Sequence, residues 1–277
     1  MKLFRKLAAI SLAVVMVVLT CSGCSSSQNK MQQIRESGKL VMYTNAAFPP
    51  YEFLGENGEI TGVDVEIGKA IAEELGVTLE VNNANFDGIV SAIASGKGDV
   101  GIAGITITDE RSQRVDFSEP YIESVQYLIL SQDSEIQVLE DLASKTVGAQ
   151  TGTTGYLYLD DQNRDGLMTD QPCNLLAYQT PTDAMVALSE GKLDAVVVDQ
   201  LVAEQLAKSQ PNFIAIPLIT ASGEQVKEEC GVAVAKGNED LLAVINQVIE
   251  QMKSDGSIDQ YFVEYSELVE QSNGNGA

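Results

Sequence analysis

Two groups of polar residues stand where a folded chain could hold a small charged molecule. Thr106 ends the short apolar run GIAGI at residues 101–105, and Arg111 follows five positions later. A guanidinium with a hydroxyl near it is a good receptor for a carboxylate. Asp199 follows a second apolar run, VVV at residues 196–198, and a carboxylate suits an ammonium group. These residues could therefore bind a molecule that carries both charges.

Each of these residues also has a purely structural interpretation. Arg111 could be a solvated helix-surface arginine, and Thr106 could satisfy local backbone groups. The helix start at Thr108 and Asp109, directly before Arg111, favours the carboxylate role. Asp199 could cap a helix, and a buried carboxylate needs either that role or a cationic partner.

The composition excludes several kinds of chemistry. The 277 residues contain no His, which excludes Ser-His-Asp catalysis, a histidine general base and imidazole-bound metal. The chain has 17 Lys and Arg against 40 Asp and Glu, a formal net charge of −23. Such a charge argues against nucleic acid or an anionic membrane surface as the main partner. We expect no cofactor.

The chain alternates strand-like and helix-like segments. Residues 39–44 favour a strand, and a proline pair at 49–50 forces a turn or an extended loop. Apolar residues keep a helical period from Val63 to Leu75, and Gly76 follows as a stop before a strand at residues 77–81. This alternation indicates an α/β fold with a mostly parallel sheet.

A short internal sequence repeat predicts two similar lobes. Residues 92–100 read AIASGKGDV and residues 187–196 read ALSEGKLDAV, so Gly96 aligns with Gly191 at an offset of 95 (191 − 96). In open α/β sheets, ligands gather beyond the carboxyl ends of strands. One lobe would then present Arg111 and Thr106, and the other would present Asp199. If the lobes face each other, an α-amino acid is the first ligand to consider.

The amino terminus has the pattern of an export signal. Three basic residues lie in residues 1–6, and the apolar run at 7–20 is short for a membrane span. The residues around Cys24 resemble a bacterial lipobox, which would make Cys24 the lipidated first residue after a signal peptide of residues 1–23, although Cys21 replaces the usual aliphatic residue. We expect an extracytoplasmic lipoprotein anchored to the cell membrane, with ordinary secretion or an uncleaved anchor helix as alternatives. Cleavage would change the charge from −23 to −26, since three positive charges leave (−23 − 3).

Several motifs occur in the order found in one known family. The segments TGVDVEIGKAIAEELG, GDVGIAGITITDERSQRVDFSEPY, VGAQTGTTG, GKLDAVVVD and CGVAVAKGN lie within residues 38–263. The chain resembles the polar amino-acid solute-binding proteins of ABC importers. The resemblance implies an α/β, two-lobed periplasmic-binding-protein-like (type II) fold with a two-segment hinge. It also implies a monomeric receptor without catalysis that delivers a polar L-amino acid to a membrane permease.

The resemblance also implies the domain boundaries. After the signal peptide, a polar tether would occupy residues 24–37. Lobe 1 would comprise residues 38–124 and 228–270, and lobe 2 residues 125–227, with hinge crossings near 121–125 and 225–230. The polar composition of residues 271–277 predicts a disordered tail.

The resemblance further implies roles for individual residues. Arg111 would bind the ligand α-carboxylate and Asp199 the α-ammonium. The amide of Asn45 stands where some relatives have an acid, which slightly favours a neutral ligand such as glutamine over arginine or lysine. Phe48 and Phe86 would cover the ligand, although either could instead belong to the core. The remaining contacts to the carboxylate would come from Thr106, the backbone of Ala103 and Gly104, and the loop residues Gln150, Thr153 and Thr154.

Two features stay open at this point. Asp161, Asn163 and Asp165 have the opening spacing of a calcium loop, but Pro172 replaces the closing Glu, which favours an acidic surface hairpin. Cys173 and Cys230 could form a disulfide in an exported protein or remain separate thiols.

Two other functions compete with transport. The fold could serve as a ligand-sensing module for a separate signalling partner, because no signalling domain follows Ala235 in the sequence. It could also be an enzyme related to the dehydratases that resemble these proteins. The lack of His and of an obvious acid–base carboxylate pair argues against the enzyme.

Overall fold

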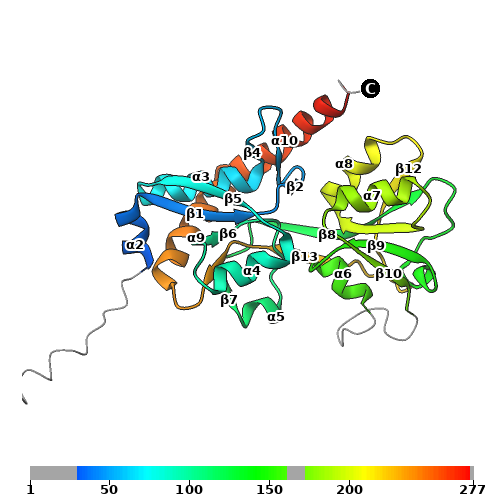
Figure 1. Cartoon of the computed structure of the whole chain (residues 1–277), viewed down its shortest axis with the longest axis horizontal. Helices are drawn as coiled ribbons and strands as arrows, with labels where there is room; N and C mark the ends of the chain where they lie inside the picture. The colour runs from blue at the N-terminus through cyan, green and yellow to red at the C-terminus, as the bar shows by residue number, and fades with distance from the viewer. Residues whose placement is uncertain (1–29, 161–171, 275–277) are drawn as a thin grey trace, which may run out of the picture.

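A computed structural model describes residues 30–160 and 172–274 of the chain. It has two lobes joined by a narrow pair of strands (Figure 1). The expected signal peptide, the lipidation site at Cys24 and the calcium candidate Asp161, Asn163 and Asp165 lie outside the described residues.

The first lobe is built on a five-stranded sheet of order β5-β1-β6-β14-β7. The first three of these strands are parallel, and the last two run antiparallel to their neighbours. Along β1, the buried Leu40, Met42 and Thr44 alternate with more exposed residues, because successive side chains of a strand point to opposite faces of the sheet. The strands are β1 (Lys39–Thr44), β5 (Thr78–Asn83), β6 (Val100–Gly101), β7 (Val115–Phe117) and β14 (Ala233–Ala235).

The second lobe repeats this arrangement in the sheet order β10-β9-β11-β8-β12. The parallel trio β10-β9-β11 corresponds to β5-β1-β6, and helices α4 (Phe86–Ala94) and α7 (Pro181–Ser189) precede β6 and β11. The internal sequence repeat therefore marks equivalent elements of two similar lobes. The strands are β8 (Ile122–Ser131), β9 (Thr146–Gln150), β10 (Asn174–Tyr178), β11 (Ala195–Asp199) and β12 (Phe213–Pro217).

The prediction of a mostly parallel sheet is confirmed for all but one strand of each sheet. The reversed strand is β14 in the first lobe, antiparallel to β6 and β7, and β8 in the second lobe, antiparallel to β11 and β12. The cause is the crossing of the chain between lobes. Strand β8 enters the second sheet from the first lobe and pairs with β11. Strand β14 returns to the first sheet and pairs with β6.

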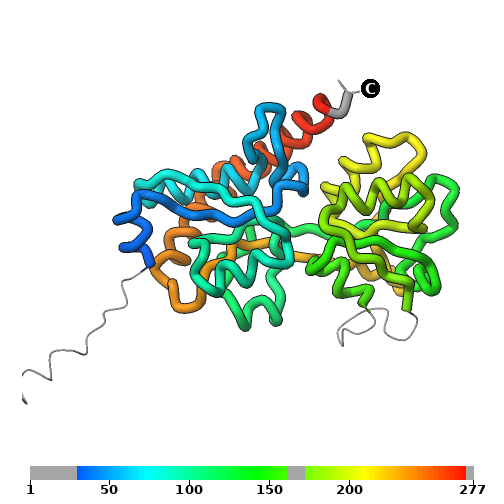
Figure 2. Tube along the Cα trace, in the orientation of Figure 1, coloured from blue at the N-terminus to red at the C-terminus, as the bar shows by residue number. Residues whose placement is uncertain are grey.

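Two antiparallel strands connect the lobes. The first part of β8 pairs with β13 (Lys227–Cys230), in the register Val125 to Lys227 and Ile122 to Cys230. Figure 2 shows the chain passing to the second lobe along β8 and returning beside it. A two-stranded ribbon of this kind can bend without disturbing either sheet, as a hinge requires.

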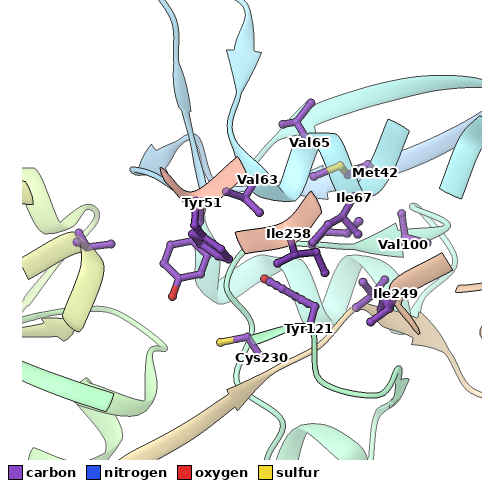
Figure 3. Close-up of a cluster of buried hydrophobic side chains, with 14 of the residues drawn as sticks. Met42, Tyr51, Val63, Val65, Ile67, Val100, Tyr121, Cys230, Ile249 and Ile258 are labelled. Carbon is purple, nitrogen blue, oxygen red and sulfur yellow. The ribbon is translucent and has the colours of Figure 1, made fainter. Parts of the chain in front are cut away.

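Helices cover the sheet of the first lobe on both faces. Helix α3 (Val63–Leu75) ends at Gly76, which has the left-handed backbone (φ 71°) that favours glycine at this position. It packs beside α9 (Glu239–Ser254) and α10 (Ser257–Gly274), while α4 lies on the other face (Figure 1). The α3–α9 side forms much of the core, where Met42, Val63, Ile67 and Ile249 meet (Figure 3). The remaining elements are α2 (Lys30–Ser37), β2 (Ala47–Phe48), β3 (Glu52–Leu54), β4 (Ile60–Thr61), α5 (Asp109–Ser112), the 3-10 turn Leu139–Leu142, α6 (Thr154–Leu159) and α8 (Gln200–Lys208).

The predicted polar tether is wrong for its second half. Residues Lys30–Ser37 form helix α2, with Ile34 buried at 2% exposure. Lys30 pairs with Asp99 at 2.5 Å, a contact that joins this helix to the start of β6. Two apolar residues, Met31 and Ile34, are too few to show a helical period in a polar run, so only the tertiary contacts reveal the helix.

The predicted disordered tail is wrong for residues 271–274, which continue helix α10. Ile258, Phe262 and Val269 of this helix are buried, so the helix is anchored by packing rather than by its polar end. Extending an existing helix costs far less than starting one, and the Ser272 hydroxyl donates to the carbonyl of Leu268 at 3.0 Å.

The two cysteines of the described chain do not form a disulfide with each other. Cys173 packs against the core of the second lobe. Cys230 lies on β13, where its buried Sγ is 3.4 Å from the carbonyl oxygen of Gly104. Of the two arrangements left open by the sequence, the structure has separate thiols.

Within the described ranges, no helix has both the length and the apolar character to cross a membrane.

Candidate functional site

A cavity lies between the lobes, and its lining includes every residue predicted to contact a ligand. It encloses about 30 Å³. The first lobe and its edge supply seven of the predicted residues: Asn45, Phe48, Phe86, Ala103, Gly104, Thr106 and Arg111. The second lobe supplies the other four: Gln150, Thr153, Thr154 and Asp199.

Arg111 is held at the wall of this cavity by contacts to both lobes. Thr108 caps the short helix α5 and accepts from the backbone N–H of Arg111 at 3.2 Å. The buried guanidinium donates to the carbonyl of Thr106 at 2.7 Å and to that of Gly152, in the other lobe, at 3.0 Å. Burial lowers the pKa of Arg111, an effect that the nearby Glu228 opposes. Because a guanidinium has five N–H donors, these bonds leave some for a ligand.

The aromatic residues predicted at the site lie at its wall. The ring of Phe86 lies 5.5 Å from the guanidinium carbon of Arg111, a cation–π arrangement. Phe48 lies 5.2 Å from the ring of Tyr51, between centroids. Both phenylalanines are half-buried and border the cavity rather than belong to the deep core.

The backbone of Gly104 is already engaged. Its N–H donates to Oδ2 of Asp64 at 2.7 Å, so this donor is not spare for a ligand carboxylate. Gly104 has φ 55°, and an added Cβ would lie 3.0 Å from the Phe48 ring. Its role at the site is therefore close approach of the chain, which a side chain would prevent.

Asp199 stands at the end of β11, where it caps the next helix and also lines the cavity. It caps α8, since Oδ1 accepts from the backbone N–H of Leu201 at 3.0 Å. The same oxygen accepts from the Tyr51 hydroxyl of the other lobe at 3.1 Å, and Oδ2 accepts from Ser124. In Figure 3 the Tyr51 hydroxyl points out of the core of the first lobe. Burial raises the pKa of Asp199 to about 7.

Further hydrogen bonds cross between the lobes at the cavity. Gln150 Nε2 donates to Oδ1 of Asn45 at 2.8 Å, and the hydroxyls of Thr106 and Thr154 lie 3.4 Å apart. Thr153 instead serves its own lobe, where it caps α6 and accepts from the N–H of Tyr156 at 3.2 Å.

Five residues of the lining were not predicted. Val197 and Val198 directly precede Asp199, so the prediction of a site at the end of this strand could have included them. Glu228 lies in one predicted hinge crossing and Gln126 directly follows the other, and the two side chains bond to each other at 2.8 Å. Glu52 faces Phe48 across the β2–β3 pair, which only the register reveals. In the part of the chain that the structure describes, no group of three His, Cys, Asp or Glu could hold a metal ion.

Comparisons with known proteins agree with this geometry. Residues 40–267 match the family model for "Bacterial extracellular solute-binding proteins, family 3". The chain is 33% identical over 251 residues to the L-cystine-binding protein TcyJ of Escherichia coli K12, covering 88% of this chain and 90% of TcyJ.

Two solved structures illustrate the range of similar proteins. One is AbpA of Streptococcus pneumoniae, an amino acid ABC transporter substrate-binding protein bound to L-arginine; it shares 30% identity and a TM-score of 0.78 over 86% of this chain and 98% of AbpA. The other is the ancestral amino-acid-binding protein AncCDT-1, a precursor of cyclohexadienyl dehydratase. Here the identity is 30% and the TM-score 0.74 over 86% of this chain and 99% of the other.

The family match covers most of the chain, and the two-lobed α/β fold is the one that these neighbours share. The chain belongs to the bacterial extracellular solute-binding proteins of family 3.

Proposed function

We propose that this protein binds a polar L-amino acid between its lobes and delivers it to the permease of an ABC importer. The observation that carries the proposal is one cavity that combines Arg111 from the first lobe with Asp199 from the second. The guanidinium matches the α-carboxylate of the ligand, and the carboxylate of Asp199 matches its α-ammonium. Recognition of these two groups selects amino acids as a class.

Binding requires the lobes to separate first. A cavity of about 30 Å³ has room for roughly two water molecules and is far too small for an amino acid. Entry therefore breaks the bonds from Tyr51 to Asp199 and from Gln150 to Asn45, which the ligand replaces with its own. Bending of the β8–β13 ribbon would supply this motion.

Binding measurements against a panel of amino acids test this function directly. Isothermal titration calorimetry of the purified protein against the polar L-amino acids should give binding at a 1:1 ratio for at least one. The corresponding D-amino acid and the amine that lacks the α-carboxylate are the controls, and both should bind much more weakly because each breaks the match to Arg111 and Asp199. Failure of every L-amino acid to bind would contradict the proposal.

We further propose that the protein has no catalytic activity. The resemblance to a precursor of cyclohexadienyl dehydratase makes an enzyme the specific alternative. The chain has no His to act as a general base, and the site carboxyls of Asp199 and Glu228 are engaged with Tyr51, Ser124 and Thr106. Incubation with each bound amino acid, followed by mass spectrometry, should return the ligand unchanged; a product would favour the enzyme.

A lipid anchor at Cys24 would hold this receptor at the cell membrane beside its permease. The basic start, the apolar run and the polar stretch after Cys24 support this placement. Cys24→Ser is expected to move the protein from the membrane fraction to the soluble extracytoplasmic fraction, with ligand affinity unchanged. Retention of the variant at the membrane would instead indicate an uncleaved anchor helix.

A further inference from the structure

The turn that follows β9 brings the second lobe against the first. It spans residues 150–153, where the carbonyl of Gln150 accepts from the N–H of Thr153 at 3.2 Å and from its hydroxyl at 2.8 Å. Gly152 is the third residue of this turn and has φ 80°, a left-handed backbone that glycine adopts most readily. A residue with a side chain would be strained there, so the turn itself favours glycine.

Contact with the first lobe is a second, independent reason for glycine. A Cβ added at Gly152 would lie 2.9 Å from the Cβ and 3.1 Å from the Cα of Asp87, in the first turn of α4. Carbon atoms that are not bonded to each other pack at about 3.5–4.0 Å, so no side chain fits between the two segments. The missing side chain is therefore what allows the two lobes to approach this closely.

Gly152 also contacts the guanidinium of Arg111. Its carbonyl accepts from Arg111 Nη2 at 3.0 Å, and the ring of Phe86, directly before Asp87, lies 5.5 Å from the guanidinium carbon. Among the described residues, Arg111 lines the cavity and Gly152 does not. Gly152 would therefore act on a bound molecule through Arg111 and not by touching it.

This contact links the approach of the lobes to the orientation of Arg111. One residue lies against α4 and also reaches the guanidinium, so the two contacts form together. A hydrogen bond from a charged donor is stronger than one between neutral groups, and it holds the planar guanidinium in one orientation. A side chain at Gly152 would hold the turn away from α4 and remove that bond.

We propose that Gly152 is a positioning residue for ligand binding, because its lack of a side chain lets the lobes meet and so holds Arg111 in place for the α-carboxylate. This inference rests on the proposed function and adds a residue to the same site. Since all amino acids share the carboxylate, Gly152 affects every ligand alike and does not select among side chains. Its effect lies mainly in the dissociation rate, because lobes that close incompletely release a ligand sooner.

Gly152→Ala tests the inference against the panel of polar L-amino acids. By calorimetry, the variant should bind each amino acid that the wild-type protein binds at least about tenfold more weakly, the loss expected for one hydrogen bond to a charged group. The affinity ratios among these amino acids should stay within about threefold of the wild-type ratios. Stopped-flow mixing should show most of the loss as faster dissociation.

A second glycine separates the contact between lobes from backbone strain. Gly191, in the same lobe, has a similar φ of 72°, and in the described parts of the chain no atom beyond its chain neighbours lies within 4 Å of an added Cβ. Gly191→Ala should lower the thermal midpoint by about 2 to 8 °C, as Gly152→Ala should, but leave every affinity unchanged. If Gly152→Ala fails to fold, Gly152→Asn carries the test, because asparagine tolerates left-handed backbone and still has a Cβ.

Substitutions of Asp87 test whether the collision between lobes is the cause. Asp87→Gly removes the Cβ that an added Cβ at Gly152 would strike, whereas Asp87→Ala removes the carboxylate but keeps that Cβ. Each double variant is compared with its own Asp87 single variant, as in a double-mutant cycle. Adding Gly152→Ala should cost less than about threefold in affinity beside Asp87→Gly and at least about tenfold beside Asp87→Ala.

Several results would overturn the inference while leaving the amino-acid receptor function intact. They are unchanged affinities in Gly152→Ala, altered ratios among the amino acids, an equal loss in Gly191→Ala, and equal losses beside Asp87→Gly and Asp87→Ala. The third of these would assign the effect to backbone strain, and the fourth would exclude the collision. Failure of the wild-type protein to bind any amino acid would overturn the inference and the proposed function together.

Discussion

Arg111→Ala is expected to abolish measurable binding of every amino acid, whichever side chain the ligand carries. The guanidinium is the only cationic group in the described lining of the cavity, so nothing else there can neutralise an α-carboxylate. Removing one partner of a buried, hydrogen-bonded charge pair costs about 2 to 5 kcal/mol, or roughly 30-fold to several thousand-fold in affinity. Calorimetry against the same panel of amino acids measures this loss.

Controls must separate recognition from folding, because Arg111 also bonds to two carbonyls. Arg111→Ala leaves the oxygens of Thr106 and Gly152 without this donor, so its thermal midpoint should fall modestly. Arg111→Lys keeps the charge but loses the planar fork, and its affinity should lie between wild type and Ala. Arg114→Ala removes an exposed arginine of the same segment, bonded to Ser91, and should bind normally.

A change in preference among ligands would contradict this role. If Arg111→Ala still bound some amino acids tightly, the guanidinium would be contacting side chains rather than the shared carboxylate. An unfolded variant would be visible in the thermal midpoint, in which case Arg111→Lys carries the test.

Local chemistry made much of this site predictable. The sequence just before Arg111 fixes where this residue lies, because Thr108 caps the short helix that carries it. Asp199 ends a fully buried strand, and the end of such a strand in an α/β sheet is a usual place for ligands. The strand at Lys39–Thr44 and the stop at Gly76 also followed from propensity and backbone alone.

What the sequence could not predict depends on contacts between distant segments. Glu52 becomes a site residue because β2 and β3 pair, and Glu228 because β13 pairs with β8. No period or motif marks either residue, and two glutamates among 40 acidic residues carry no signal. Similarly, the one reversed strand of each sheet, β8 or β14, arises from the double crossing, which depends on where the chain returns rather than on any strand's own residues.

The second large effect concerns Asp199, whose ionisation should control ligand affinity. Burial raises the pKa of Asp199 from 3.8 to about 7, and an ammonium ligand pairs only with the ionised carboxylate. Affinity should therefore rise about tenfold per pH unit below pH 7 and level off above it. Calorimetry at several pH values between 5 and 7.5 measures this slope for the wild-type protein.

The same shift has the opposite effect on stability without added ligand. Because the pKa is higher in the folded than in the unfolded protein, the protonated form favours folding. This stabilisation is complete below about pH 4 and is lost as the pH rises to about 7, so the thermal midpoint should fall over that range. Asp64, whose pKa burial also raises to about 7, adds to this fall but does not line the cavity. Glu52, whose pKa burial also raises, adds to it as well.

Asp199→Asn separates the two effects, because asparagine can still cap α8 and keep the local structure. The variant should bind amino acids at least about 100-fold more weakly at pH 7.5, since the ammonium loses its charged partner. Its affinity should no longer rise between pH 5 and 7.5, and its midpoint should fall less steeply with pH, because only Asp64 and Glu52 then keep raised pKa values among the buried carboxyls named here. A variant that kept the full pH slope of binding would show that another group pairs with the ammonium, and Glu228 would then be the carboxylate to test, because it lines the same cavity.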